Sequence, residues 1–185
     1  MTAFDDCIAR GGVAVFPADT VYGLACDPLN ADAVARLYWL KGRPPDKPAA
    51  VMFFDPEQAL LPELSPRTRA LMARLLPAAV TLLVPSDRYP LAGGNGTLGL
   101  RVPDVPALGG RPVLQSSANH AGGPDARRLE DVPEAIRGGA DLVLDGGELP
   151  GTPSTVVDLR EYEASGELQI VRSGAVPEAV IRSLA

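Results

Sequence analysis

Short apolar segments alternate with amphipathic segments along the whole chain. Strand-like apolar runs, many of them bounded by proline or glycine, occupy residues 13–16, 49–54, 80–84, 98–102, 112–114, 142–144, 155–158 and 168–171. Helix-like patterns cover residues 2–10, 31–41, 66–75 and 129–137, and a last one begins at Pro177. Because helices and strands interleave throughout, the pattern predicts a layered α/β fold with a mixed sheet of about seven strands.

Capping residues define the helices that we predict most sharply. Asn30 precedes the periodic segment 31–41 and Gly42 follows it, which is typical of a capped helix with a glycine stop. Ser65-Pro66 marks another helix start. No linker, repeat or low-complexity tract interrupts the pattern, so we expect residues 1–185 to form a single domain.

The charge balance limits the classes of partner. The chain has 17 basic and 23 acidic residues, a formal net charge of −6, so its surface as a whole repels polyanions and any nucleic-acid contact must rest on a local patch. No run approaches 18 apolar residues, and the chain opens with Asp5 and Asp6 rather than with a basic segment before an apolar one. We therefore expect a cytoplasmic protein without a membrane contact.

Few residues are available for metal or hydrolase chemistry. Cys7 and Cys26 stand apart and His120 is the only histidine, so the usual ligands of a zinc site are missing and we predict no protein-bound metal. Mg²⁺ held by phosphates stays compatible with the sequence. A Ser-His-Asp hydrolase would have to use His120, three residues after Ser117 and without a nucleophile elbow, which disfavours that class. Cys26 is expected to be a small buried hydrophobe.

One motif misleads if it is taken alone. Residues 94–99 read Gly-Asn-Gly-Thr-Leu-Gly, which matches G-x-G-x-x-G, but a proline-rich turn precedes them and a strand follows. A dinucleotide fingerprint has to open a helix, so the segment is predicted to be a hairpin turn.

Lysine usage is more informative. Of the 17 basic residues only two are lysines, and both Lys41 and Lys47 lie with Arg43 in the seven residues 41–47. Pro44 and Pro45 stiffen this segment, which suits cations that must be held at a fixed spacing against adjacent phosphates. A solvated loop after a helix terminus explains the same residues, and the segment alone does not decide between the two.

Further polar groups follow predicted strands. Short runs with hydroxyl, amide or arginine groups stand at 17–20, 116–119, 153–155 and 172–174. Open α/β sheets bind ligands beyond strand ends, so these runs could converge on one pocket for a small phosphate compound.

Six motifs in this order resemble the YrdC/TsaC family, and the resemblance covers nearly the whole chain. They are Pro-x-Asp-Thr-Val-Tyr-Gly-Leu at 17–24, Lys-x-Arg-Pro-x-x-Lys-Pro at 41–48, Gly-Leu-Arg-Val-Pro at 99–103, Ser-Ala-Asn at 117–119, Pro-Ser-Thr-Val-Val-Asp at 153–158 and Arg-Ser-Gly at 172–174. The resemblance implies a single three-layer α/β domain with a twisted mixed sheet around a deep, positively lined cavity. It also implies an L-threonylcarbamoyladenylate synthase, a nucleotidyltransferase that joins L-threonine, bicarbonate and ATP and releases pyrophosphate for tRNA threonylcarbamoyladenosine formation.

The resemblance assigns residues to each substrate. Thr20, Arg101 and Ser154 would bind L-threonine. The groups that would bind ATP, with its Mg²⁺, or the adenylate are Lys41, Arg43, Lys47, Thr97, Ser117, Asn119 and Arg172. Arg43 and Lys47 would serve catalysis by aligning the phosphates and stabilising their charge.

The chain departs from the family pattern at three places. Pro77-Ala78-Ala79 stands where Pro-Gly-Pro is usual, Gln115 where a serine is common, and Asp125 where a hydroxyl is often found. A YciO-like paralogue with an altered acceptor or another carbamoyl-transfer activity therefore stays open, as does an RNA-binding module that uses the cations of 36–47. The chain resembles the short bacterial form, which would need partner proteins to transfer the product to tRNA, so its own contact with tRNA is expected to be weak or indirect.

Overall fold

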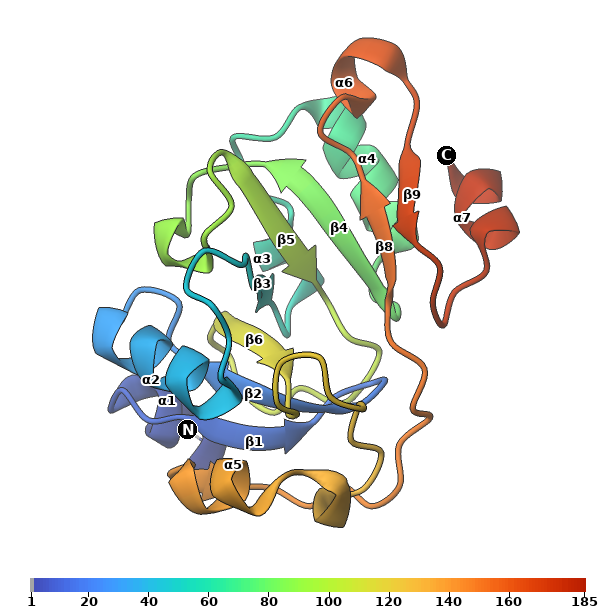
Figure 1. The fold of residues 1–185 in the computed structure, drawn as a ribbon. Helices are drawn as coiled ribbons and strands as arrows, with labels where there is room; N and C mark the ends of the chain where they lie inside the picture. The colour runs from blue at the N-terminus through green and yellow to red at the C-terminus, as the bar shows by residue number, and fades with distance from the viewer. Residues whose placement is uncertain (1) are drawn as a thin grey trace.

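One continuous sheet organises the protein. The structure is a computed structural model and describes residues 2–185, which form nine strands in the order β7-β1-β2-β6-β3-β5-β4-β8-β9 (Figure 1). The strands are β1 (Ala14–Pro17), β2 (Tyr22–Cys26), β3 (Ala50–Met52), β4 (Val80–Pro85), β5 (Thr97–Arg101), β6 (Val113–Ser117), β7 (Leu142–Val143), β8 (Thr155–Asp158) and β9 (Gln169–Arg172).

The sheet is mixed, as predicted. β3 pairs with β5, β4 with β8 and β1 with β7 in parallel, while the remaining neighbours are antiparallel. The helices, in chain order, are α1 (Ala3–Ala9), α2 (Ala31–Lys41), α3 (Pro56–Ala59), α4 (Pro66–Leu75), α5 (Glu134–Gly139), α6 (Tyr162–Ser165) and α7 (Glu178–Leu184). Short 3₁₀ turns occupy Pro90–Ala92 and Leu129–Asp131.

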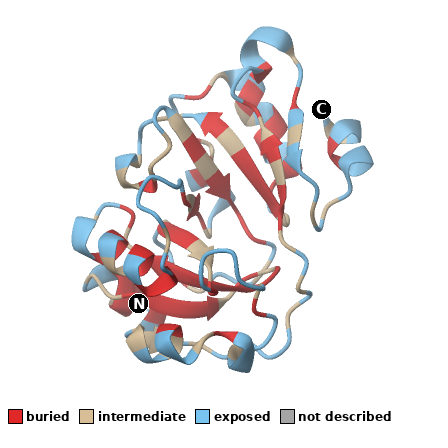
Figure 2. Cartoon of the chain, viewed as in Figure 1, coloured by how far each residue is buried: buried red, intermediate tan, exposed pale blue. Residues whose placement is uncertain are grey.

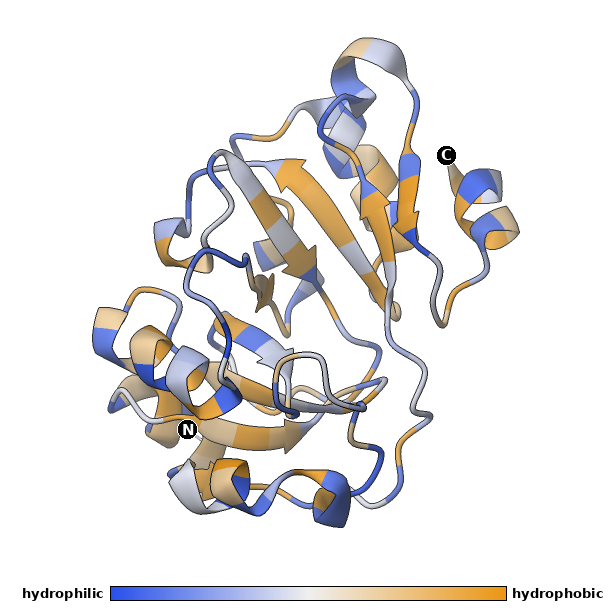
Figure 3. Cartoon of the chain, in the orientation of Figure 1, coloured by the Kyte–Doolittle hydropathy of each residue, from blue (hydrophilic) through white to orange (hydrophobic). Residues whose placement is uncertain are grey.

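Side chains alternate between the two faces of the sheet, and each face has its own core. On one face Val15, Leu24, Leu100 and their neighbours form the larger core, which α2, α4, α5 and α7 cover. On the other face Phe16 and Met52 belong to a smaller core under α1. Helices on both faces of a mixed sheet confirm the predicted fold class, and Figures 2 and 3 show that most of the strands are both buried and hydrophobic.

Local signals predicted several elements to the residue. α2 begins after Asn30, whose side chain accepts a hydrogen bond from the Ala33 N–H at 3.0 Å, and ends at Gly42, which has a φ of 59°. The serine cap of α4 at Ser65 is present as well. Residues 94–96 end the loop between β4 and β5, and residues 97–99 begin β5, so the segment opens no helix and belongs to the antiparallel pair that the hairpin prediction implied.

Other boundaries differ from the prediction. The sheet has nine strands rather than about seven, and the strand missed altogether is β2, which follows the polar run 17–20. β6 extends to Ser117, because its backbone pairs with β2 as far as Gly23, whereas the predicted strand ended at residue 114. The helix expected over 129–137 is divided into a 3₁₀ turn and α5, since Pro133 follows the turn and cannot continue a helical ladder.

Core burial gives the first testable prediction. Leu37 on α2 is fully buried, whereas Leu29, just before that helix, is 65% exposed. Leu37→Ala should lower the free energy of unfolding by about 2–5 kcal/mol, because it removes apolar contacts and leaves a cavity. The same change at Leu29 should cost less than about 0.5 kcal/mol. Urea unfolding of both variants measures this, and similar losses would contradict the predicted packing of α2.

Candidate functional site

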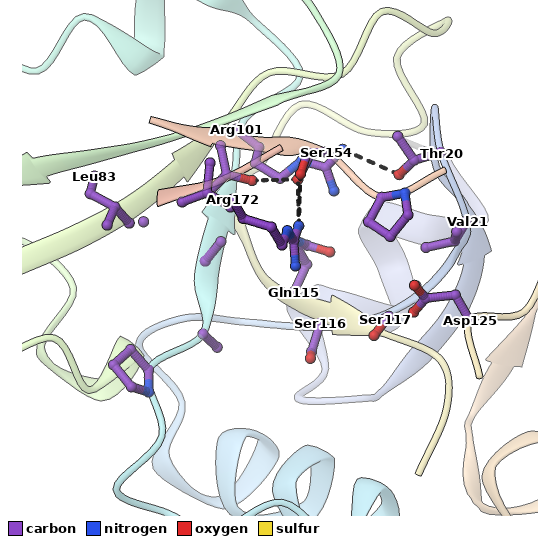
Figure 4. Close-up of a pocket in the computed structure, with 18 of the residues that line it drawn as sticks. Thr20, Val21, Leu83, Arg101, Gln115, Ser116, Ser117, Asp125, Ser154 and Arg172 are labelled. Carbon is purple, nitrogen blue, oxygen red and sulfur yellow. Dashed lines mark hydrogen bonds between the residues drawn. The ribbon is translucent and has the colours of Figure 1, made fainter. Parts of the chain in front are cut away.

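A cavity of about 510 Å³ opens on the face of the sheet that carries the smaller core. Alternate residues of neighbouring strands line it: Thr81 and Leu83 of β4, Thr97, Gly99 and Arg101 of β5, and Gln115 and Ser117 of β6 (Figure 4). Leu98 and Leu100 lie between the lining residues of β5 and are buried in the larger core. The period of two in these strands thus builds a polar cavity on one face and an apolar core on the other.

Small residues keep the floor of the cavity open. Ala50 of β3 pairs with Gly99 of β5 and with Gln115 of β6, and both Ala50 and Gly99 line the cavity. A Cβ on Gly99 would lie 3.4 Å from the Cα and Cβ of Ala50. Because Gly99 adds no side-chain atoms, the space above it stays free for a ligand between the longer polar side chains.

Arg101 occupies the most deeply buried position among the cations of the cavity. Its Nη2 donates to Asp19 Oδ1 at 2.6 Å and lies 3.5 Å from Thr20 Oγ1, and both side chains of the ion pair are about 5% exposed. Burial lowers the pKa of Arg101, and the charge of Asp19 opposes that shift. Within residues 2–185 the Nε of Arg101 is buried without a partner, so the guanidinium has unused donors.

A second polar cluster lies beside Arg101. Ser154 Oγ is 2.8 Å from Thr81 Oγ1, and Arg172 Nη2 donates to the Ser154 carbonyl at 2.8 Å. Figure 4 shows Ser154, Arg172 and Thr20 arranged around the same space as Arg101. Hydroxyl donors and two guanidinium groups therefore converge on one end of the cavity, which suits a carboxylate or another small anion.

The basic loop contributes one residue to the cavity wall. Arg43 lines the cavity, its Nε donates to the Lys47 carbonyl at 3.4 Å, and its guanidinium lies 5.9 Å from the centre of the Tyr38 ring. Arg43 also donates to the Pro48 carbonyl. Lys47 itself is exposed and does not line the cavity in this structure.

Lys41 lies inside a cage of oxygens. Its Nζ donates to the Ser117 carbonyl at 2.5 Å, to the Asn119 carbonyl at 2.9 Å and to Asn119 Oδ1 at 2.6 Å, and it lies 3.2 Å from Ser117 Oγ. Burial, together with the nearby Arg43, lowers the pKa of Lys41 to about 8, which leaves the amine mainly charged at neutral pH. Lys41 joins the end of α2 to the loop after β6 and so fixes Ser117 at the cavity wall.

The cavity brings together most of the residues that the sequence suggested. Those that line it are Thr20, Arg43, Thr97, Arg101, Ser117, Ser154 and Arg172. Lys41, Lys47 and Asn119 do not reach its wall; the first and last are buried in the oxygen cage. Their contact with a nucleotide stays a prediction.

Sequence reasoning did not select several residues that the structure brings to the site. Thr81 and Arg160 line the cavity, and Asp19 forms an ion pair with Arg101 without lining the cavity itself. Thr81 is the only polar residue in the apolar run 80–84, which was a usable signal. Asp19 stands in the run 17–20, but nothing in the sequence shows that its partner is 82 residues away.

The structure gives no support to a cysteine nucleophile or to a Ser-His-Asp hydrolase that uses His120. Burial and the nearby Asp27 raise the pKa of Cys26 to about 12, as expected for a buried hydrophobe rather than a nucleophile. Ser117 Oγ donates to Asn119 Oδ1 at 2.7 Å, and His120 is exposed on the following loop. Residues 2–185 contain no group of three or more His, Cys, Asp or Glu side chains placed to hold a metal ion. None of the helices in that range is long and apolar enough to cross a bilayer.

Comparison with known proteins identifies the family. The model of the Sua5/YciO/YrdC family, described as "Telomere recombination", matches residues 6–174, so the chain belongs to this family and the resemblance is confirmed. Threonylcarbamoyl-AMP synthase of Pyrococcus abyssi is 33% identical over 182 residues, which make up 92% of this chain and 52% of that protein. The synthase of Chromohalobacter salexigens is 38% identical and aligns over 84% of this chain and 90% of its own length. The chain spans about half the length of the Pyrococcus and Bacillus subtilis relatives.

Solved structures with the same fold agree with the family. P. abyssi Sua5 complexed with L-threonine has a TM-score of 0.85 and 31% identity, and the match covers 97% of this chain and 55% of that one. E. coli YciO has a TM-score of 0.76 and 26% identity, with 93% and 87% covered. The fold therefore occurs in both a Sua5 synthase and a YciO protein.

The two lysines provide a matched test of the oxygen cage. Lys41→Met should lower the free energy of unfolding by about 1.5–3 kcal/mol, because two buried oxygens of Asn119 and the partly buried oxygens of Ser117 lose a charged donor. Lys47→Met changes an exposed side chain and should leave stability within about 0.5 kcal/mol. Denaturant unfolding at pH 7 compares them, and equal stability of the two variants would show that the cage contributes nothing.

Proposed function

We propose that this protein condenses L-threonine, bicarbonate and ATP to threonylcarbamoyl-AMP, water and pyrophosphate. The observation that carries the proposal is a single cavity with two differently built ends. Arg101 and Ser154 are fixed at one end, while Arg43 and Ser117 line the cavity beside the basic loop. The synthase names of the relatives, which align over most of the chain, support the same reaction.

The amino-acid substrate fits the end near Arg101. A carboxylate would meet the guanidinium donors that Asp19 leaves free, and the hydroxyls of Thr20 and Ser154 lie beside it. Leu83, Val156 and Val21 line the same cavity and could receive a methyl group. The structure of P. abyssi Sua5 is a complex with L-threonine, and this supports the same choice here.

The nucleotide would occupy the end near the basic loop. Arg43, Thr97 and Ser117 line the cavity, and Lys41 and Asn119 hold Ser117 in place. Arg172, which donates to the Ser154 carbonyl, would reach the nucleotide from the amino-acid end. Lys47, on the exposed loop, would complete the phosphate contacts when the loop closes over ATP. Mg²⁺ would be bound by the phosphates and would offset part of their charge.

The proposed chemistry needs alignment more than proton transfer. Bicarbonate loses hydroxide to give carbon dioxide, and the neutral amine of L-threonine adds to that carbon dioxide to give a carbamate and a proton. The proton and the hydroxide combine as the water released. A carbamate oxygen then attacks the α-phosphorus of ATP, the bond from that phosphorus to the bridging oxygen breaks, and pyrophosphate leaves. Arg43 and Lys47 would stabilise the charge on the phosphate oxygens, while Arg101 fixes the attacking group. This makes the protein a nucleotidyltransferase.

The product defines the remaining partners. Threonylcarbamoyl-AMP is a reactive mixed anhydride, so a tRNA threonylcarbamoyl-transfer system should consume it in the cytoplasm. A net charge of −6 disfavours tight binding of tRNA by this chain, so we expect the product to pass to partner proteins. Gln115, which lines the cavity in place of a serine, is the specific feature that keeps a YciO-like activity with another acceptor as a second candidate.

The reaction itself is the next prediction. The purified protein should release pyrophosphate from ATP only when L-threonine, bicarbonate and Mg²⁺ are all present, since the carbamate is the attacking group. A coupled pyrophosphate assay with each component omitted in turn measures this. L-serine should be a poorer substrate by about 10- to 200-fold, because it lacks one methyl group.

The same assay separates the candidates. ATP turnover that is indifferent to L-threonine would contradict the synthase proposal. Turnover that depends on another amine, with no effect of L-threonine, would favour the YciO-like activity.

A further inference from the structure

Asp19 is a buried carboxylate that no substrate role explains. It follows β1, its side chain is 5% exposed, and it does not line the cavity. Oδ1 accepts from Arg101 Nη2 at 2.6 Å, and Oδ2 is buried without a partner among residues 2–185. Burial of a carboxylate costs desolvation free energy, and an ion pair with a neighbouring cation has to offset that cost.

Arg101 does need a counter-charge in this position. Its side chain is 6% exposed, and the positive charge of Arg172, which lines the same cavity, acts against it. Without an anion behind it, the guanidinium would gain by turning away from Arg172 or toward solvent. Asp19 bonds to one guanidinium nitrogen, Nη2, while Arg101 itself lines the cavity and its Nε has no partner among residues 2–185.

We propose that Asp19 is a positioning residue for amino-acid recognition: it fixes the plane of the Arg101 guanidinium so that the remaining donors meet the carboxylate of the substrate. The inference rests on the proposed function, because it takes the ligand at this end to be an α-amino acid. It predicts that the charge of Asp19 matters for the amino acid and not for ATP.

A loss of affinity for L-threonine without a loss of affinity for ATP distinguishes this role from a general structural one. Asp19→Asn keeps the size of the side chain and an oxygen acceptor but removes the charge. It should weaken binding of L-threonine at least about tenfold, because the guanidinium loses its fixed orientation, and should change ATP binding by less than about twofold. Isothermal titration of each substrate measures both affinities without turnover.

The chain offers a matched control outside the cavity. Arg36 Nη1 and Asp141 Oδ2 also form an ion pair at 2.6 Å, but both side chains are about 40% exposed and neither lines the cavity. Asp141→Asn should leave both affinities unchanged. In an Arg101→Ala background, Asp19→Asn should add no further loss of L-threonine affinity, because the group that it positions is absent.

Three outcomes would overturn the inference: unchanged L-threonine affinity in Asp19→Asn, equal losses for L-threonine and ATP, or a full additional loss in the Arg101→Ala background. If Asp19→Asn does not fold, Asp19→Glu keeps the charge and moves it by one methylene. That variant should still lose L-threonine affinity selectively, and wild-type affinity would equally overturn the inference. A wild-type protein that binds no L-threonine would contradict the proposed function instead.

Discussion

The cavity depends on the two-residue period of the central strands. On β5, Leu98 and Leu100 enter the larger core, which obliges Thr97, Gly99 and Arg101 to face the opposite side. A shift of one residue in register would exchange these sets and bury a leucine where the cation stands. Pairing with β3 and β4 prevents that shift, since Gly99 is paired with Ala50 on one side and with Leu83 on the other.

Folding assembles the site from segments that are far apart in the chain. Asp19 and Thr20 follow β1, Arg43 follows α2, Arg101 ends β5 and Ser154 precedes β8. The strands next to Thr20, Arg101 and Ser154 belong to one sheet, so the backbone ladder sets how far apart the segments that carry these side chains lie. Asp19 and the Lys41 cage then hold Arg101 and Ser117 from behind the cavity wall. The cavity can therefore concentrate positive charge although the chain as a whole is acidic.

Local signals in the sequence predicted local structure, while contacts between distant residues required the fold. Asn30 and Gly42 marked both ends of α2, because caps act within one turn. β2 was missed because Gly23 and Ala25 weaken its strand pattern, and its place between β1 and β6 gives it the stability that its composition lacks. The motifs selected Arg101 and Ser117. No local pattern could reveal that Asp19 pairs with Arg101, or that the amine of Lys41 binds the oxygens of Ser117 and Asn119. Such ion pairs and cages depend on side chains 82 and 76 residues apart.

The central claim is that one cavity holds an amino acid by its carboxylate at Arg101 and a nucleotide beside Arg43. A crystal structure with L-threonine and a non-hydrolysable ATP analogue tests it most directly. We predict that the L-threonine carboxylate lies within hydrogen-bond distance of the Arg101 guanidinium and that the phosphates lie toward Arg43 and Ser117. L-threonine bound with its carboxylate away from Arg101, or a nucleotide bound outside this cavity, would contradict the account.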